Sequence, residues 1–134
     1  MTGLTGSPPP SRTALRRVRG LGSAGSGTRH FWATRVTAVA LVPLTIAFVV
    51  IVVALLGRNQ AAVLQILGSP LVAVLMLLFV AASVYHMWLG MQEIVIDYVH
   101  GELLKLMTLM ANTFFSLALG FACVFAILKL SFGV

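Results

Sequence analysis

A histidine, a glycine and two carboxylates recur at helical spacing in the middle of the chain, within sequence that is otherwise apolar. His86, Gly90, Glu93 and Asp97 follow one another at intervals of four, three and four residues. At about 100° per residue, these positions share one face of an α-helix. Ionisable groups in an apolar helix are costly and usually mark a functional site. The stretch 85–98 is therefore the first candidate for chemistry.

Three kinds of chemistry fit this polar face. Ala82 and Gly90 lie one turn before and after His86, which leaves room for a large flat group such as haem b, with the imidazole as an axial ligand. A proton relay could run from His86 through the two carboxylates to His100. A structural histidine, hydrogen-bonded to a neighbouring helix, also fits. Spacing alone leaves all three open.

Composition indicates the environment in which this face operates. The chain has 134 residues, of which 60% are hydrophobic and 9% charged, and a mean hydropathy of +1.05. Soluble domains carry about 25% charged residues, so we expect a membrane protein. A membrane-spanning helix needs roughly 20 apolar residues, and three segments qualify, at about 36–56, 70–91 and 106–128. These spans leave no room for a soluble catalytic domain, so we expect no catalytic residue in this chain and any catalysis to require partners.

The predicted fold is all-α, with three transmembrane helices that run up, down and up. Residues 1–28 are rich in Gly, Ser, Pro and Arg without apolar periodicity, which predicts a flexible basic arm. Residues 29–134 form the transmembrane domain. The arginines of this arm favour its binding to anionic membrane lipids. No aromatic residues are interleaved with its arginines, so we expect no nucleic-acid binding.

Charge distribution predicts the orientation in the membrane. Six of the nine basic residues are arginines within residues 1–35. Because positive segments stay on the cytoplasmic side, the N-terminus and the 92–105 turn should be inside and the 57–69 loop outside. We expect a bacterial inner membrane. The mitochondrial inner membrane is the second candidate, because the Arg- and Ser-rich arm has the composition of a transit peptide.

The polar face, extended to the next residue, resembles the hydrophobic membrane anchor subunit of succinate dehydrogenase, the smaller of its two anchors. In that family a histidine is followed four residues later by glycine and seven residues after that by Asp-Tyr. His86, Gly90, Asp97 and Tyr98 match this pattern. An arginine followed by Thr-Ala before an apolar span is a second shared feature, here in residues 35–38. The likeness covers residues 29–134.

The resemblance implies cofactors and partners. His86 would be one axial ligand of haem b, and the cytochrome b anchor subunit would cover the polar face and supply the other. Tyr98 would hydrogen-bond a carbonyl of ubiquinone, with Asp97 beside it. The remaining partners would be the iron–sulfur subunit and the flavoprotein subunit, on which succinate is oxidised. The chain would thus serve electron transport between the tricarboxylic acid cycle and the respiratory chain.

The resemblance also implies a polar cluster at the start of the first span. Arg35, together with either His30 or Arg29, would lie near the haem propionates or the quinone pocket. The resemblance suggests no role for Glu93. The alternative function, drawn from the residues alone, is a small proton-conducting or transporter subunit that uses the histidine and carboxylates of the polar face as a relay.

Overall fold

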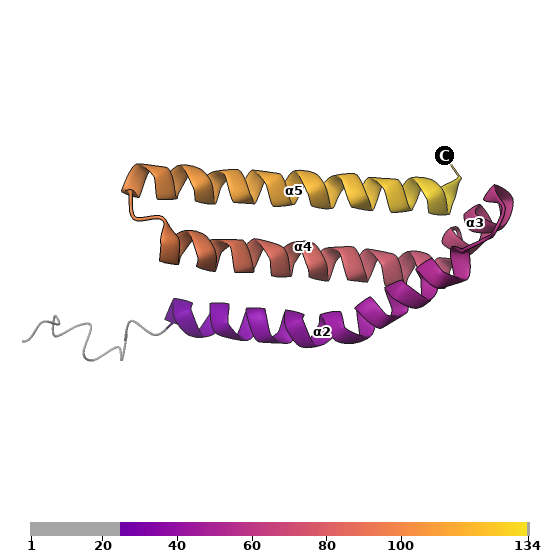
Figure 1. Cartoon of the computed structure of the whole chain (residues 1–134), viewed down its shortest axis with the longest axis horizontal. Helices are drawn as coiled ribbons and strands as arrows, with labels where there is room; N and C mark the ends of the chain where they lie inside the picture. Colours follow the sequence, from indigo (N-terminus) through magenta and orange to yellow (C-terminus); the bar gives the residue numbers. More distant parts are fainter. Residues whose placement is uncertain (1–24, 134) are drawn as a thin grey trace, which may run out of the picture.

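The computed structural model describes residues 25–133, and it shows them as four helices joined by short connections (Figure 1). Helix α2 spans Gly25–Leu55, α3 spans Gln60–Leu67, α4 spans Pro70–Tyr98 and α5 spans Glu102–Phe132. The three long helices α2, α4 and α5 are each long and apolar enough to cross a membrane. The predicted all-α architecture with three spans is therefore confirmed.

Helix α4 lies between α2 and α5 and packs against both of them (Figure 1). The three long helices run alternately up, down and up. Phe48 of α2 stacks on Phe79 of α4, with 4.5 Å between the ring centroids. On the other side of α4, Val84 faces Gly120 of α5 closely enough that a Cβ on the glycine would lie 3.5 Å from the valine Cγ1. The helices therefore form a single layer with α4 at its centre.

The connection between α2 and α4 is set by local turn chemistry. Gly57 adopts a left-handed backbone with φ of 72°, which favours glycine, just after α2 ends. Asn59 caps α3, because its side chain accepts a hydrogen bond from the Ala62 N–H at 2.9 Å. Helix α4 begins at Ser69 and Pro70, where the predicted second span starts, and the serine hydroxyl donates back to the Ile66 carbonyl instead of capping α4.

The connection between α4 and α5 is shorter than predicted. Helix α5 begins directly after Gly101, so only residues 99–101 separate the two helices. The ammonium group of Lys105 reaches back from α5 and donates to the Ile96 carbonyl at 3.0 Å. It thereby satisfies one of the carbonyls that have no partner at the end of a helix.

All three long helices extend further than the predicted spans, α5 by four residues at each end. Helix α4 continues without a break to Tyr98, as the argument for a shared polar face requires. Helix α2 begins at Gly25, four residues before the expected start of the transmembrane domain. The rest of the predicted arm, residues 1–24, lies outside the described residues. Pro43 lies inside α2, and the helix bends there (Figure 1), because proline lacks an N–H and its ring clashes with the preceding turn.

Few side chains are enclosed by this layer. Among residues 27–133, the buried apolar side chains are Ile51, Ala73, Leu89 and Val95. Most of the large apolar side chains on the three long helices are exposed. Such surfaces are stable when they face lipid or the helices of another membrane subunit, because neither requires hydration of apolar groups.

Candidate functional site

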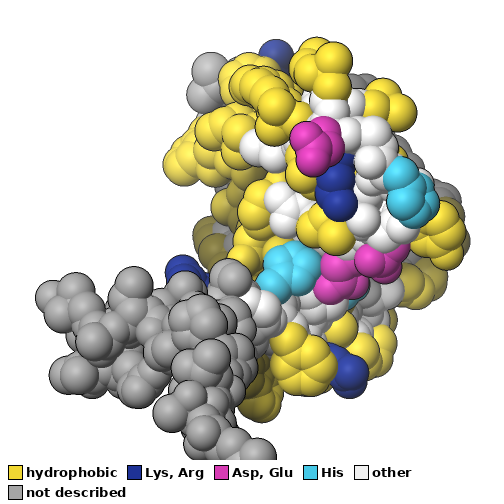
Figure 2. All heavy atoms as spheres, turned by 90° about the vertical axis from the view of Figure 1, so that its left-hand side faces the viewer, with side chains coloured by type: hydrophobic (Ala, Val, Ile, Leu, Met, Phe, Trp, Pro, Cys, Tyr) yellow, Lys and Arg dark blue, Asp and Glu magenta, His cyan; other side chains and the backbone are white. Residues whose placement is uncertain are grey.

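The charged and titratable side chains of the described chain gather at one end of the layer (Figure 2). This polar end is made by the start of α2, the end of α4 and the start of α5. It holds all three acidic residues of the sequence, together with two of its three histidines. They are Glu93, Asp97, Glu102, His30 and His100. Arg58 and Lys129 lie at the opposite end.

His86 lies deeper in the layer, within α4 and about 18 Å from Tyr98 at 1.5 Å per residue. Its Nδ1 is 2.9 Å from Oγ1 of Thr37 on α2. Its Nε2 has no hydrogen-bond partner within residues 25–133, and this atom is not buried. His86 therefore contacts α2 through one ring nitrogen, and its other ring nitrogen has no partner in the described chain.

The space beside this histidine is open. Gly90 follows it by one helical turn, and a Cβ added to this glycine would meet nothing within 4 Å. Ala82, one turn on the other side, adds only a methyl group and is half-buried. The structure therefore has open space along the α4 backbone beside His86, as the small side chains of Ala82 and Gly90 predicted.

Glu93 contacts α2, although the family resemblance suggested no role for it. Its Oε1 lies 3.3 Å from Nδ1 of His30, and the two side chains are 51% and 31% exposed. The other ring nitrogen of His30 is buried without a partner in the described chain. Helix α2 therefore covers the polar face at both His86 and Glu93. The expectation that a second anchor subunit also covers that face stays a prediction.

The side chains at the end of α4 are open to the surroundings. Tyr98 is 78% exposed, and Asp97 beside it is also exposed. Neither side chain has a hydrogen-bond partner within residues 25–133. No hydrogen bond in the same part of the chain links Glu93 to His86 or to Asp97. The members of the alternative proton relay are therefore not joined by direct hydrogen bonds within the described residues.

The two arginines of the predicted polar cluster lie on the first turns of α2. The guanidinium carbon of Arg35 lies 4.9 Å from the ring centroid of Phe31, a cation–π distance. Arg29 is exposed. Within the predicted cluster, His30 contacts Glu93. The side chains of both arginines are exposed at the polar end of the layer.

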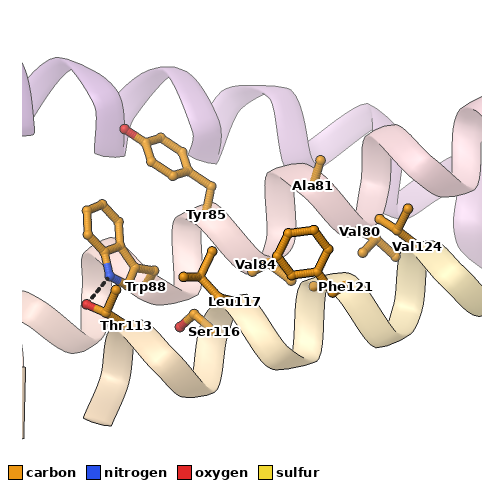
Figure 3. Close-up of a pocket in the computed structure, with 11 residues that line it drawn as sticks. Val80, Ala81, Val84, Tyr85, Trp88, Thr113, Ser116, Leu117, Phe121 and Val124 are labelled. Carbon is orange, nitrogen blue, oxygen red and sulfur yellow. Dashed lines mark hydrogen bonds between the residues drawn. The ribbon is translucent and has the colours of Figure 1, made fainter. Parts of the chain in front are cut away.

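A separate apolar groove of about 390 Å³ lies between α4 and α5 (Figure 3). Tyr85 stacks on Trp88 at its edge, with 5.8 Å between the ring centroids. The indole N–H of Trp88 donates to Oγ1 of Thr113 at 3.1 Å. The groove is lined by residues from α4 and α5, and His86 and Gly90 are not among them. It is therefore distinct from the open space beside His86.

The polar residues of the third span face α4, where their side chains avoid lipid. Asn112 is buried and donates to the Trp88 carbonyl at 3.1 Å, and the Ser116 hydroxyl lies 3.5 Å from the Asn112 side-chain oxygen. The residue that sequence reasoning missed is Thr37, the partner of His86. Its signal was present, because it belongs to the Arg-x-Thr-Ala segment 35–38.

Comparison with known proteins identifies the family. Residues 9–127 match the family model described as succinate dehydrogenase/fumarate reductase transmembrane subunit. The chain is 34% identical over 121 residues to the succinate dehydrogenase hydrophobic membrane anchor subunit of Paracoccus denitrificans, covering 90% of this chain and 93% of that protein. It is 28% identical over 106 residues to the subunit of the same name from Rickettsia bellii (strain RML369-C), covering 79% and 85%. No solved structure matches the chain significantly. With its three apolar membrane-length helices, the chain belongs to the succinate dehydrogenase/fumarate reductase transmembrane subunit family, as a membrane anchor subunit.

Proposed function

We propose that this anchor subunit binds haem b through His86 and contributes Tyr98 and Asp97 to a site where ubiquinone is reduced. The observation that carries the haem proposal is the unpartnered Nε2 of His86, which is not fully buried and belongs to a membrane-length helix with open space at Gly90. An axial ligand needs an accessible imidazole nitrogen and room for the porphyrin plane, and these residues fit that need. Haem, when bound, would accept and return single electrons.

The second axial ligand would come from another chain. The sequence has three histidines, and His30 and His100 lie at the polar end of the layer, away from His86. A haem with two imidazole ligands at the depth of His86 would therefore need a histidine from the cytochrome b anchor subunit. The exposed side of α4 around Gly90 would face that subunit.

The proposal for ubiquinone rests on the open end of α4. A quinone head is apolar except for its carbonyl oxygens, which gain negative charge on reduction and then favour a hydrogen-bond donor. The exposed Tyr98 hydroxyl is such a donor, and the neighbouring Asp97 carboxyl can pass protons from water. His30, Arg29 and Arg35 lie at the same end and would bind the haem propionates or line the quinone pocket.

The partners and location follow from this arrangement. The iron–sulfur subunit would dock at the polar end, and succinate would be oxidised on the flavoprotein subunit. The chain would anchor these subunits to the membrane and help to pass electrons from succinate to quinone, which links the tricarboxylic acid cycle to the respiratory chain. We place the chain in a bacterial inner membrane, and the excess of arginines toward the N-terminus supports an orientation with that end in the cytoplasm.

Haem ligation is tested with His86→Ala in the complex purified with its partner subunits. We expect the reduced b-type absorption band to be lost, because no other histidine of this chain lies at that depth. His100→Ala is the matched control, since His100 is exposed in the turn between α4 and α5. Full haem content in His86→Ala would show that the ligand assignment is wrong.

The quinone role is tested with Tyr98→Phe, which removes only the hydroxyl. Loss of a hydrogen bond to a developing charge costs about 1.5–3 kcal/mol, so quinone reduction should fall roughly 10- to 100-fold. Succinate oxidation by an artificial acceptor should be unchanged. Tyr85→Phe, whose ring stacks on Trp88 away from the polar end, is the control. If Tyr98→Phe retains normal quinone reduction, the tyrosine is not the donor.

A further inference from the structure

We propose that Thr37 is the positioning residue of the haem site: it determines which nitrogen of His86 carries the proton and directs the other nitrogen outward as the ligand. This inference rests on the proposed haem ligation. It concerns a contact between two helices, because Thr37 belongs to α2 and His86 to α4, 49 residues further along the chain.

The proton assignment follows from the acceptors around the threonine hydroxyl. Oγ1 of Thr37 lies 2.8 Å from the Ala33 carbonyl oxygen and 3.1 Å from that of Thr34. A carbonyl oxygen only accepts, so the hydroxyl can donate its single proton to one of them, and we assign the proton there. The same Oγ1 is 2.9 Å from Nδ1 of His86, and with the hydroxyl proton held within α2, Nδ1 is the donor of this bond.

The remaining ring nitrogen is consequently the ligand atom. A neutral imidazole carries one N–H, and when this is at Nδ1 the lone pair is at Nε2. Nε2 of His86 has no partner in the described chain and is not fully buried. The hydrogen bond to Thr37 thus both selects the tautomer that can bind iron and orients the free nitrogen away from α2.

The acceptor itself is held in a fixed place. Thr37 is half-buried, and its hydroxyl bonds back to the preceding turn of its own helix. This back-bonding selects the side-chain rotamer of a threonine, which is already restricted by its branched Cβ. The ring of His86 is therefore fixed from two helices, and its orientation depends on the packing of α2 against α4.

The same hydrogen bond should tune the bound iron. Donation from the distal N–H of a ligating histidine raises the basicity of the ligating nitrogen, and removal of such a partner typically costs about 10- to 100-fold in metal affinity or activity. A more basic ligand favours ferric over ferrous iron. Loss of the Thr37 hydroxyl should therefore weaken haem retention and raise the midpoint potential.

The test compares Thr37→Val with Thr37→Ser in the complex purified with its partner subunits. Valine keeps the shape of threonine and lacks the acceptor, so we expect haem to be lost about 10- to 100-fold more readily to a haem-accepting protein. We also expect shifted g values of the ferric haem in electron paramagnetic resonance and a higher midpoint potential. Serine keeps the hydroxyl and should restore all three properties.

Thr34→Val is the matched control. Thr34 lies one turn before Thr37 on α2, and its hydroxyl donates to the His30 carbonyl at 3.0 Å without contacting His86. Its substitution should leave the g values, the midpoint potential and haem retention unchanged. If valine at position 37 hinders assembly, Thr37→Ala removes the hydroxyl without that bulk, and its haem spectrum in membranes is interpreted in the same way.

The outcomes separate this inference from the proposed function. If His86→Ala loses haem while Thr37→Val matches the wild type in g values, potential and retention, the positioning role is refuted and the ligand assignment stands. If His86→Ala keeps its haem, the proposed ligation fails and the inference fails with it. Equal defects in Thr37→Val and Thr37→Ser would also overturn it, because the hydroxyl would then be irrelevant.

Discussion

The contact between His30 and Glu93 joins α2 to α4 at the polar end, next to the side chains proposed for the quinone site. The separation is 3.3 Å, and one-third to one-half of each side chain is exposed. Water and salt screen such pairs, which typically contribute about 0.2–1 kcal/mol. The stronger link between these helices is therefore expected in the apolar layer, at Thr37 and His86 and at the stacked Phe48 and Phe79.

Glu93→Gln should accordingly lower the free energy of unfolding of the complex by at most about 1 kcal/mol. The amide oxygen of glutamine can still accept a hydrogen bond from His30, so mainly the charge is lost. Thermal unfolding at low and high salt measures the effect, and Glu102→Gln, at the start of α5, is the control. A loss of several kcal/mol would mean that the pair is desolvated in the assembled complex.

At the scale of elements, the α4–α5 pair is joined by side-chain hydrogen bonds in the middle of the membrane. Asn112 is buried against α4 and donates to the Trp88 carbonyl, and Trp88 donates to Thr113 in return. Apolar side chains gain little by leaving lipid for another helix, so small residues and polar contacts such as these specify which helix faces meet.

Asn112→Ala should destabilise the α4–α5 pair by about 0.6–1.7 kcal/mol, the measured range for hydrogen bonds between membrane helices. Unfolding of the purified complex in detergent measures this loss. Thr108→Val is the comparison, because the Thr108 hydroxyl bonds only to the Leu104 carbonyl of its own helix. An equal loss in both variants would show that the interhelical bond contributes nothing specific.

The sequence was sufficient for the number and order of the long helices, because apolar composition and local turn chemistry determine them. Ser69 and Pro70 marked the start of α4, and the spacing from His86 to Asp97 required that this helix continue past the predicted span. The pairing of particular side chains between helices was not predictable in the same way. His86 and Thr37 are far apart in the sequence, and either could have faced lipid or another subunit without changing any local pattern.

At the scale of the whole molecule, the two ends of the layer differ in charge. The polar end carries every acidic residue of the sequence as well as Arg29, Arg35 and Lys105, and the opposite end carries Arg58 and Lys129. In membrane proteins, the loops and helix ends that carry more Lys and Arg usually lie on the cytoplasmic side. The polar end should therefore be cytoplasmic.

Cysteine labelling tests this orientation in a Cys123→Ser background. With Arg58→Cys, a membrane-impermeant maleimide should label the complex from the periplasmic side of intact spheroplasts. With His100→Cys, labelling should occur only in inside-out vesicles, because His100 is exposed in the turn at the polar end. The reverse pattern would place the proposed quinone site on the wrong side for a cytoplasmic dehydrogenase.

The position of α4 between its two neighbours has a consequence for how the molecule tolerates change. Since α4 separates α2 from α5, the contacts on its two sides share no side chains at Thr37 and Asn112. Free-energy changes at separated, unconnected sites add nearly independently. Substitutions that repack the α5 side should therefore have little thermodynamic coupling to the geometry of the histidine on the α2 side.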